Sequence, residues 1–321
     1  MKILFIVGVG RSGTSLLQSM FASNPFVSFI SETGFIRRYL TKGVLEKLYV
    51  KRGMSGATLH LAQDKAFNRT GLDAEVLLGE AIKSRGLLDR AVYVKILNAY
   101  NADNAVYVGD KDPRLIEFLP LLASLFDCVE VLNIIRDPRD VLLSKKKAAW
   151  SAHGHVWKHI FANRMQLSLG RYWGPRLFYG NYHEVIYEDL ISDPNTVLSQ
   201  LCVKIGIPYD SAMLSFGIAA KTLTSDSELS WKKETFGPLL SNNKEKWRIG
   251  LSSKEIALTE LCCRDAFAAG GYQLDEHNRL KLSWFDKAWV FLGAALIFIA
   301  DRSYRYYRNF VVYQACKRNN Q

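Results

Sequence analysis

The chain has 321 residues, of which 49% are apolar, and this is enough to bury one substantial hydrophobic core with an appendage. Its 42 Lys and Arg residues outnumber 31 Asp and Glu residues, and the net charge of +11 favours an anionic partner without identifying it. The five cysteines include no C-x-x-C pair, which excludes a disulfide framework and a zinc ribbon. Reduced thiols in a cytoplasmic protein are the simplest interpretation. A nucleic-acid partner is disfavoured, because the sequence contains no recognised nucleic-acid-binding module.

Short apolar runs alternate with helical patterns along most of the chain. Residues 3–7 predict a first strand, because the run is too short for a signal peptide and leads directly into a glycine-rich turn. Residues 13–22 predict a helix that Asn24 and Pro25 end. Further strands are predicted at 27–30, 105–108, 129–135 and 184–187, with helices beginning near Pro113, Pro138 and Pro194. The alternation predicts an α/β fold, in which a P-loop-like parallel sheet has helices on both faces.

A loop, a helix and a tail make up the C-terminal third of the chain. Residues 223–248 are polar and basic with interleaved aromatic residues, which predicts a long functional loop. A helix is predicted over residues 252–268. We place the main domain at residues 1–280 and treat residues 281–321 as a separate tail, which is aromatic, then apolar, then basic.

This tail has the composition of a helix that lies in a membrane surface. Its apolar run, residues 288–300, would span roughly 20 Å as a helix, short of the ~30 Å hydrocarbon core of a bilayer. Aromatic side chains precede the run and alternate with arginines after it: Trp284, Phe285, Trp289, Phe291, Arg302, Tyr304, Arg305, Tyr306, Tyr307 and Arg308. We predict peripheral membrane attachment, in which case a chain ending near Leu280 should stay folded. The alternative is a C-terminal helix docked on the domain's own core.

The first polar motif is G-V-G-R-S-G-T-S, which begins at residue 8 between the first strand and helix. It has the glycine spacing of a P-loop, but Thr14 stands where a nucleoside-triphosphate P-loop has lysine. Gly10 and Gly13 allow backbone N–H groups to approach an anion, and the helix N-terminus adds its dipole. Arg11 supplies a further donor. The motif predicts phosphate binding and disfavours an ordinary ATPase or kinase.

Three further motifs also follow predicted strands, where ligands of parallel sheets bind. Arg136 ends one strand and Ser144 lies in the next helix, and together they can hold a phosphate by the guanidinium fork and the hydroxyl. Lys111 precedes the helix near Pro113, and Glu32 follows the second strand. Taken singly, a solvated lysine and a helix-start carboxylate explain the last two equally well.

Three histidines, His153, His155 and His159, follow the basic residues 145–147. The spacing places His155 and His159 on one face of a helix. Because no cysteine or carboxylate lies close in sequence, we do not predict a metal site. An acceptor-binding role or a substitute base is an alternative to the simplest interpretation, a solvated or packed cluster.

In combination, R-S-G-T-S near the N-terminus and I-R-D-P-R-D-V…S in mid-chain resemble the sulfotransferases that use 3′-phosphoadenosine-5′-phosphosulfate (PAPS). The resemblance runs from residue 1 to about residue 274, with Y-E-D-L from residue 187 and K-W-R from residue 246 in the family's order. It is greatest to the tyrosylprotein sulfotransferase-like branch and its bacterial relatives, which share E-T after the second strand and K-D-P before the mid-chain helix. The Thr-Ser ending of the first motif, in place of Thr-Thr, departs from the pattern. The tail beyond residue 280 matches nothing in the family and leaves the acceptor open.

The resemblance implies a role for each matching residue. The loop that holds the 5′-phosphosulfate corresponds to Arg11, Ser12, Gly13, Thr14 and Ser15, and the pair that holds the 3′-phosphate corresponds to Arg136 and Ser144. Glu32 corresponds to the general base, and Lys111 to a lysine that steadies the transferring group together with Arg11. Lys246 and Arg248 fall, by a looser alignment, in the loop that covers the nucleotide. No metal is required by this arrangement.

We therefore expect an enzyme that transfers a sulfonate from PAPS to a hydroxyl of a glycan or glycolipid, with peptide tyrosine as the close variant. A small-molecule kinase would need ATP and magnesium, and the missing P-loop lysine disfavours it. A nucleotide-binding protein without catalysis would bind PAPS but show no turnover.

Overall fold

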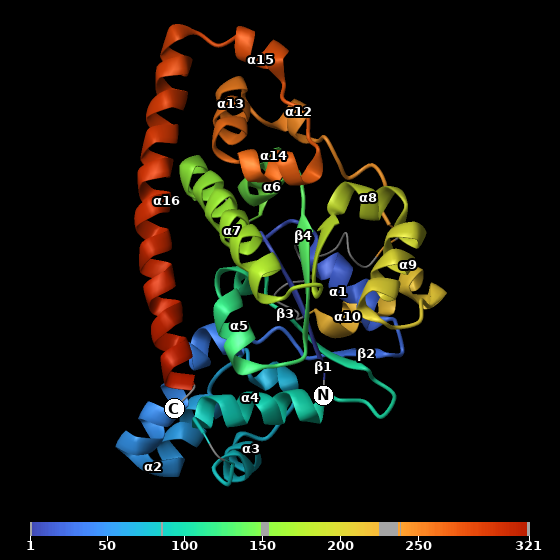
Figure 1. The fold of residues 1–321 in the computed structure, drawn as a ribbon, viewed down its shortest axis with the longest axis vertical. Coiled ribbons are helices and arrows are strands. Elements are labelled where there is room, and N and C mark those ends of the chain that lie inside the picture. Colours follow the sequence, from blue (N-terminus) through green and yellow to red (C-terminus); the bar gives the residue numbers. More distant parts are fainter. Residues whose placement is uncertain (1, 85, 149–153, 225–236, 238, 320–321) are drawn as a thin grey trace.

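A computed structural model describes residues 2–84, 86–148, 154–224, 237 and 239–319. Within these residues the centre of the fold is a parallel sheet of five strands in the order β2-β3-β1-β4-β5 (Figure 1). The strands are β1 (Lys2–Gly8), β2 (Val27–Phe29), β3 (Tyr107–Lys111), β4 (Val129–Ile135) and β5 (Tyr182–Ile186). The predicted α/β fold, with a parallel sheet flanked by helices and a C-terminal helix, is confirmed.

Helices connect the strands and cover both faces of the sheet (Figure 1). Those before β4 are α1 (Thr14–Ala22), α2 (Val44–Ala62, interrupted at Gly53), α3 (Ala74–Ala81), α4 (Leu88–Ala99), the short 3₁₀ helix η3 (Pro113–Glu117) and α5 (Leu119–Leu125). Those after β4 are α6 (Pro138–Lys147), α7 (Val156–Leu177), α8 (Tyr187–Ser192), α9 (Pro194–Ile205), α10 (Gly217–Leu223), α12 (Trp247–Gly250), α13 (Ser253–Cys262), α14 (Arg264–Gly270), α15 (Glu276–Leu280) and α16 (Trp284–Asn319).

The side chains of β1 alternate between two hydrophobic cores, as expected for a strand that is buried on both faces. Ile3, Phe5 and Val7 pack with side chains of α3, α4 and α5, whereas Leu4 and Ile6 pack with side chains of α1 and α9. A third core joins α6, α7, α13 and α16. These cores fix the carboxyl ends of β1, β3 and β4 at one edge of the sheet.

Several predicted boundaries differ from the structure. β3 continues beyond residue 108, so that Lys111 is the last residue of the strand. β5 begins at Tyr182 and ends at Ile186, and Tyr187 opens α8. The helix predicted over residues 252–268 is divided at Cys263, where φ is −101° and ψ is 36°. Half of the predicted loop 223–248, residues 225–236 and 238, lies outside the described residues.

The C-terminal helix α16 runs along the side of the molecule beside α5, α7 and α13 (Figure 1). Its inner face buries Val290, Ala294, Ile297, Val312 and Ala315. The helix is therefore docked on the domain, as the alternative prediction for residues 281–321 has it. Among the described residues, no helix is long and apolar enough to cross a membrane.

Buried ion pairs reinforce this docking. Arg308 of α16 contacts the carboxylate of Glu117 at 2.7 Å, and Arg164 of α7 contacts Asp301 of α16 at 2.9 Å. The side chains of Glu117 and Asp301 are both 1% exposed. A chain ending near Leu280 would lose the contacts of Arg308 with Glu117 and of Asp301 with Arg164, and it would expose the apolar side chains that α16 covers. The contacts thus disfavour the prediction that a chain ending near Leu280 stays folded.

Candidate functional site

The glycine-rich turn joins β1 to α1 at the carboxyl edge of the sheet. Gly13 is the residue before α1 and has φ 100°, and a Cβ added there would lie 2.5 Å from the Tyr187 ring. Only glycine satisfies both the left-handed backbone and the close approach of the ring. No described side chain caps α1, so the helix leaves its first N–H groups for an anion.

Arg11 links this turn to the end of β4 and to α6. Its Nε donates to the hydroxyl of Ser144 at 3.0 Å, and its carbonyl accepts from Nη1 of Arg136 at 3.4 Å. Its φ of 78° is uncommon for a residue with a side chain, and strain of this kind is concentrated at functional sites. The structure therefore brings together Arg11, Ser144 and Arg136, which the sequence predicts to bind one anionic ligand.

Contacts with Tyr187 and Asn243 hold Arg136 at the edge of the sheet. Its guanidinium lies 4.3 Å from the centre of the Tyr187 ring, and its Nη2 donates to the carbonyl of Asn243 at 2.9 Å. Asn243 in turn donates to the Tyr187 hydroxyl at 2.8 Å. The Nε of Arg136 is buried without a hydrogen-bond partner among the described residues. A buried, unpaired donor is costly unless a ligand satisfies it, so this atom fits a site for an anion.

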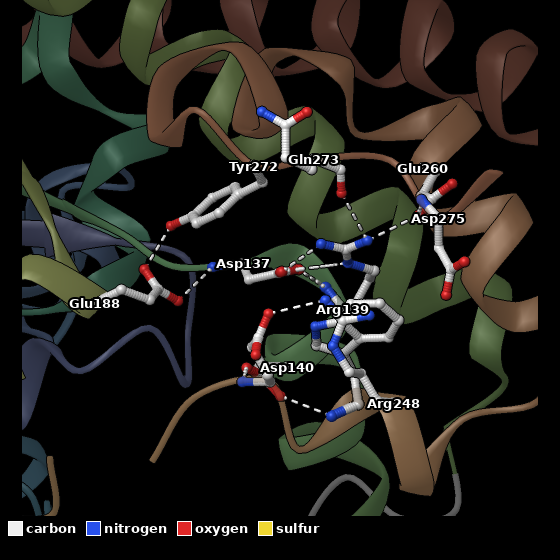
Figure 2. Close-up of polar contacts among 11 residues, drawn as sticks. Asp137, Arg139, Asp140, Glu188, Arg248, Glu260, Tyr272, Gln273 and Asp275 are labelled. Atoms are coloured by element: carbon white, nitrogen blue, oxygen red, sulfur yellow. Dashed lines mark hydrogen bonds and ion pairs between the residues drawn. The ribbon is translucent and has the colours of Figure 1, made fainter. Parts of the chain in front are cut away.

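The segment before α13 is fastened to α6 by Asp140 (Figure 2). The carboxylate of Asp140 accepts from the backbone N–H of Glu245 at 2.7 Å and of Trp247 at 3.0 Å. Burial raises the pKa of Asp140, and the positive charge of Arg136 opposes that shift. The Trp247 side chain is buried. Residues 243–248 are thereby positioned over the edge that carries Arg136.

Arg139 follows Arg136 by three residues but has a structural role. It pairs with Asp137 at 2.7 Å and with Glu260 at 2.8 Å, and it donates to the carbonyl of Gln273 at 3.1 Å (Figure 2). Its guanidinium also lies 3.7 Å from the centre of the Trp247 ring. The motifs assigned no role to Arg139 or Asp140, and Trp247 counted only as one of the aromatic residues of the predicted loop. The sequence feature that could have indicated this contact is the tryptophan of the Lys-Trp-Arg segment, because a large aromatic side chain in a polar segment is expected to pack against another residue.

Glu32 and Lys111 form an ion pair on the neighbouring strands. Lys111 ends β3 with its side chain 2% exposed, whereas the Glu32 side chain, after β2, is 26% exposed. Strand register places Lys111 beside Ile6 of β1, close to the glycine-rich turn that follows Gly8. The carboxylate is therefore accessible to a substrate, while the ammonium group that contacts it is enclosed by protein.

Carboxylates and arginines surround this pair. Arg37 pairs with Asp112 at 3.0 Å, and Arg69 donates to the backbone carbonyl of Glu32 at 3.4 Å. Asp110 accepts from the Tyr93 hydroxyl at 2.6 Å. Burial raises the pKa of Asp110 to about 7, and the Tyr93 hydrogen bond opposes the shift. Asp110 therefore changes charge near neutral pH, next to Lys111 in the sequence.

We expect Asp110 to make the folded state less stable as the pH rises from about 4 to about 7. In this range the folded state keeps a proton that the unfolded state, with a pKa near 3.8, has released. Asp110→Asn imitates the protonated form and removes this loss. The melting temperature of the variant relative to wild type should therefore rise with pH across this window. A difference that stays constant with pH would contradict the assignment.

Neither the group of Arg11, Arg136 and Ser144 nor the Glu32–Lys111 pair includes the predicted basic residues after 245 or the histidines. Lys246 and Arg248 are exposed, and Arg248 pairs with Glu245 at 2.9 Å. His155 precedes α7 with its ring against Trp157, His159 is buried, and His153 lies outside the described residues. Among the residues that the structure describes, no group of three or more metal-ligating side chains could hold an ion.

Two curated relatives share partial sequence similarity with the chain. Carbohydrate sulfotransferase 1 of Homo sapiens is 24% identical over 221 residues, which cover 61% of this chain and 51% of that protein. Protein-tyrosine sulfotransferase 1 of Danio rerio is 25% identical over 229 residues, which cover 67% and 56%. The chain thus spans about half the length of these relatives.

Solved structures support the fold. The sulfotransferase domain from the Synechococcus PCC 7002 olefin synthase has a TM-score of 0.59 and 18% identity, covering 86% of this chain and 96% of that domain. The sulfotransferase domain from the curacin biosynthetic pathway has a TM-score of 0.55 and 19% identity, covering 87% and 95%. A family profile described as Sulfotransferase family matches residues 4–211, which is more than half of the chain. The chain therefore belongs to the sulfotransferase family.

Proposed function

We propose that this protein transfers a sulfonate group from PAPS to a hydroxyl of an acceptor. The observation that carries the proposal is the placement of two clusters at one edge of the sheet. Arg11, Arg136 and Ser144 form an anion-binding cluster, and Glu32 with Lys111 forms an acid–base pair on the adjoining strands. A double-anion donor and a hydroxyl acceptor require such a pair of neighbouring sites.

The donor fits the anion-binding cluster. Arg136 and Ser144 would hold the 3′-phosphate, because the buried Nε of Arg136 offers a donor that no described residue uses. The turn from Arg11 to Ser15 and the N-terminus of α1 would hold the 5′-phosphosulfate. The exposed Lys246 and Arg248 would cover the nucleotide from the segment that Asp140 anchors.

Sulfonate transfer is an in-line displacement at sulfur, so positioning and charge stabilisation supply most of the acceleration. The acceptor oxygen forms a bond to sulfur, and the bond from sulfur to the bridging oxygen of the phosphate breaks. Glu32 takes the proton of the acceptor hydroxyl. Lys111 orients that carboxylate and, with Arg11, stabilises negative charge as the phosphate leaves. The products are the sulfated acceptor and 3′-phosphoadenosine-5′-phosphate.

The acceptor we propose is a hydroxyl of a glycan or glycolipid, and peptide tyrosine is the alternative. Relatives named for carbohydrate and for protein-tyrosine sulfotransfer are both similar to this chain. Incubation of the protein with PAPS and fractionated glycans, lipids and peptides, followed by mass spectrometry, distinguishes the two. Sulfation confined to tyrosyl peptides would overturn the glycan assignment. No sulfated product from any fraction, with nucleotide binding retained, would favour a non-catalytic binding protein.

Asp140 should act on donor binding through the segment it holds. Asp140→Ala removes both acceptors of the Glu245 and Trp247 N–H groups, so residues 243–248 should lose their position. We expect affinity for 3′-phosphoadenosine-5′-phosphate to fall about tenfold, equivalent to about 1.4 kcal/mol, by calorimetry. Asp73→Ala, which removes a helix cap at α3 far from the edge, is the matched control. Unchanged nucleotide affinity in Asp140→Ala would show that the segment takes no part in binding.

A further inference from the structure

The outer face of α16 is apolar along most of the helix. Side chains on this face include Phe285, Leu292, Leu296, Ile299, Tyr306, Phe310 and Tyr313, all of them exposed. Phe285 is 79% exposed and Ile299 is 65% exposed. At about 1.5 Å per residue, the 36 residues of α16 extend for about 54 Å. Contiguous exposed apolar surface of this kind marks an interaction site in a soluble protein.

Basic residues outnumber acidic residues on α16. Its acidic residues are Asp286 and Asp301, and Asp301 is buried against Arg164 of α7 and Arg305 of α16. The basic side chains of Arg302 and Lys317 are exposed, and helical spacing from Ile299 and Tyr313 places them beside the apolar face. A partner of this face therefore has to combine apolar character with negative charge.

We propose that α16 lies in the surface of an anionic membrane, with its outer face in the lipid and its inner face docked on the protein. An interfacial helix buries its apolar face by about 5–10 Å at the headgroup boundary, where basic side chains meet anionic lipids. The aromatic residues near each end, Trp284 and Tyr313 among them, have the amphipathic rings that are favoured at this depth. The helix thus attaches the domain without crossing the bilayer.

A second copy of the chain fits this face less well. Two such faces in contact would bring the Arg302 and Lys317 side chains of both copies into one interface. The exposed acidic complement on α16 is Asp286 alone, so the repulsion would stay largely uncompensated. An anionic bilayer supplies the missing charge along the whole face.

The test is sedimentation of the full-length protein with vesicles of phosphatidylcholine containing about a third phosphatidylserine, and with vesicles of phosphatidylcholine alone. Leu292→Asn with Ile299→Asn changes two exposed positions of the face, and Val203→Asn with Ile218→Asn changes two exposed apolar positions elsewhere. We expect wild type and control to bind the anionic vesicles and the α16 variant to bind at least about tenfold more weakly. Binding should weaken as salt rises and should be much lower on phosphatidylcholine alone.

Equal melting temperatures and nucleotide affinities in all three proteins would show that the substitutions leave the fold intact. Absence of wild-type binding to anionic vesicles would overturn the proposal, as would equal binding by the α16 variant. A concentration-dependent dimer that Leu292→Asn with Ile299→Asn dissociates, in a protein that does not bind vesicles, would assign the face to a second copy. These outcomes concern membrane binding and leave the expected transfer of sulfonate in solution unchanged. Membrane attachment and sulfonate transfer can therefore each be contradicted without the other.

Discussion

Glu32→Gln should lower kcat for sulfonate transfer by about 10²–10⁴-fold and leave the affinity for the nucleotide nearly unchanged. The glutamine keeps the shape of the side chain, and its carbonyl oxygen can still accept from Lys111, but it cannot take the proton of the acceptor. Because Glu32 follows β2 and the nucleotide cluster follows β1 and β4, the two functions should separate. Steady-state kinetics measure the first effect, and calorimetry with 3′-phosphoadenosine-5′-phosphate measures the second.

Glu80→Gln is the matched control for this experiment. Glu80 also forms an ion pair with a lysine, Lys95 at 3.1 Å, but lies on α3 in an exposed position. It should show normal turnover and normal affinity. Near-normal turnover of Glu32→Gln would remove Glu32 from the chemistry, and His155 would become the next candidate for the base.

Arg136→Ala should weaken the binding of 3′-phosphoadenosine-5′-phosphate by about 2–4 kcal/mol, which is roughly 30- to 1000-fold. The substitution removes a buried guanidinium whose Nε has no partner among the described residues. Affinity for adenosine 5′-phosphosulfate, which lacks the 3′-phosphate, should change little. Calorimetry with both ligands measures the difference directly.

Arg136 also donates to the carbonyl of Asn243, so Arg136→Ala removes a contact that positions residues 243–248 as well as a contact to the ligand. Equal losses for the two ligands would show that Arg136 positions residues 243–248 instead of holding the 3′-phosphate. Arg90→Ala is the control, because Arg90 likewise donates to a backbone carbonyl, that of Leu125 at 2.9 Å, on a helix away from this edge.

Local patterns predicted the edge of the sheet well. The apolar run before the glycine-rich motif predicts a strand, and the glycine spacing around Gly13 predicts a turn followed by a helix. These patterns are local in the sequence. In a parallel sheet the ends of β1 and β4 then meet, which brings Arg11 to Ser144 and Arg136 across more than a hundred residues of sequence. The proposed role of each of these residues came from the family resemblance.

Contacts between segments that lie far apart in the sequence were not predicted. Arg136 and Arg139 belong to one motif, yet Arg139 turns inward to Glu260, which lies 121 residues away. The docking of α16 depends on Glu117, which lies 187 residues from Tyr304 of α16. Composition indicated that residues 281–321 are aromatic, then apolar, then basic, and did not show that one face of the helix packs on the protein while the other stays exposed.

The fate of the PAPS sulfur shows whether this protein transfers a sulfonate group. The protein is incubated with sulfur-labelled PAPS and an acceptor fraction, in the presence of a metal chelator, and both products are quantified. We expect label on the acceptor in amounts equal to the 3′-phosphoadenosine-5′-phosphate released. Label that remains in PAPS, while a parallel incubation with ATP and magnesium phosphorylates the acceptor, would contradict sulfonate transfer.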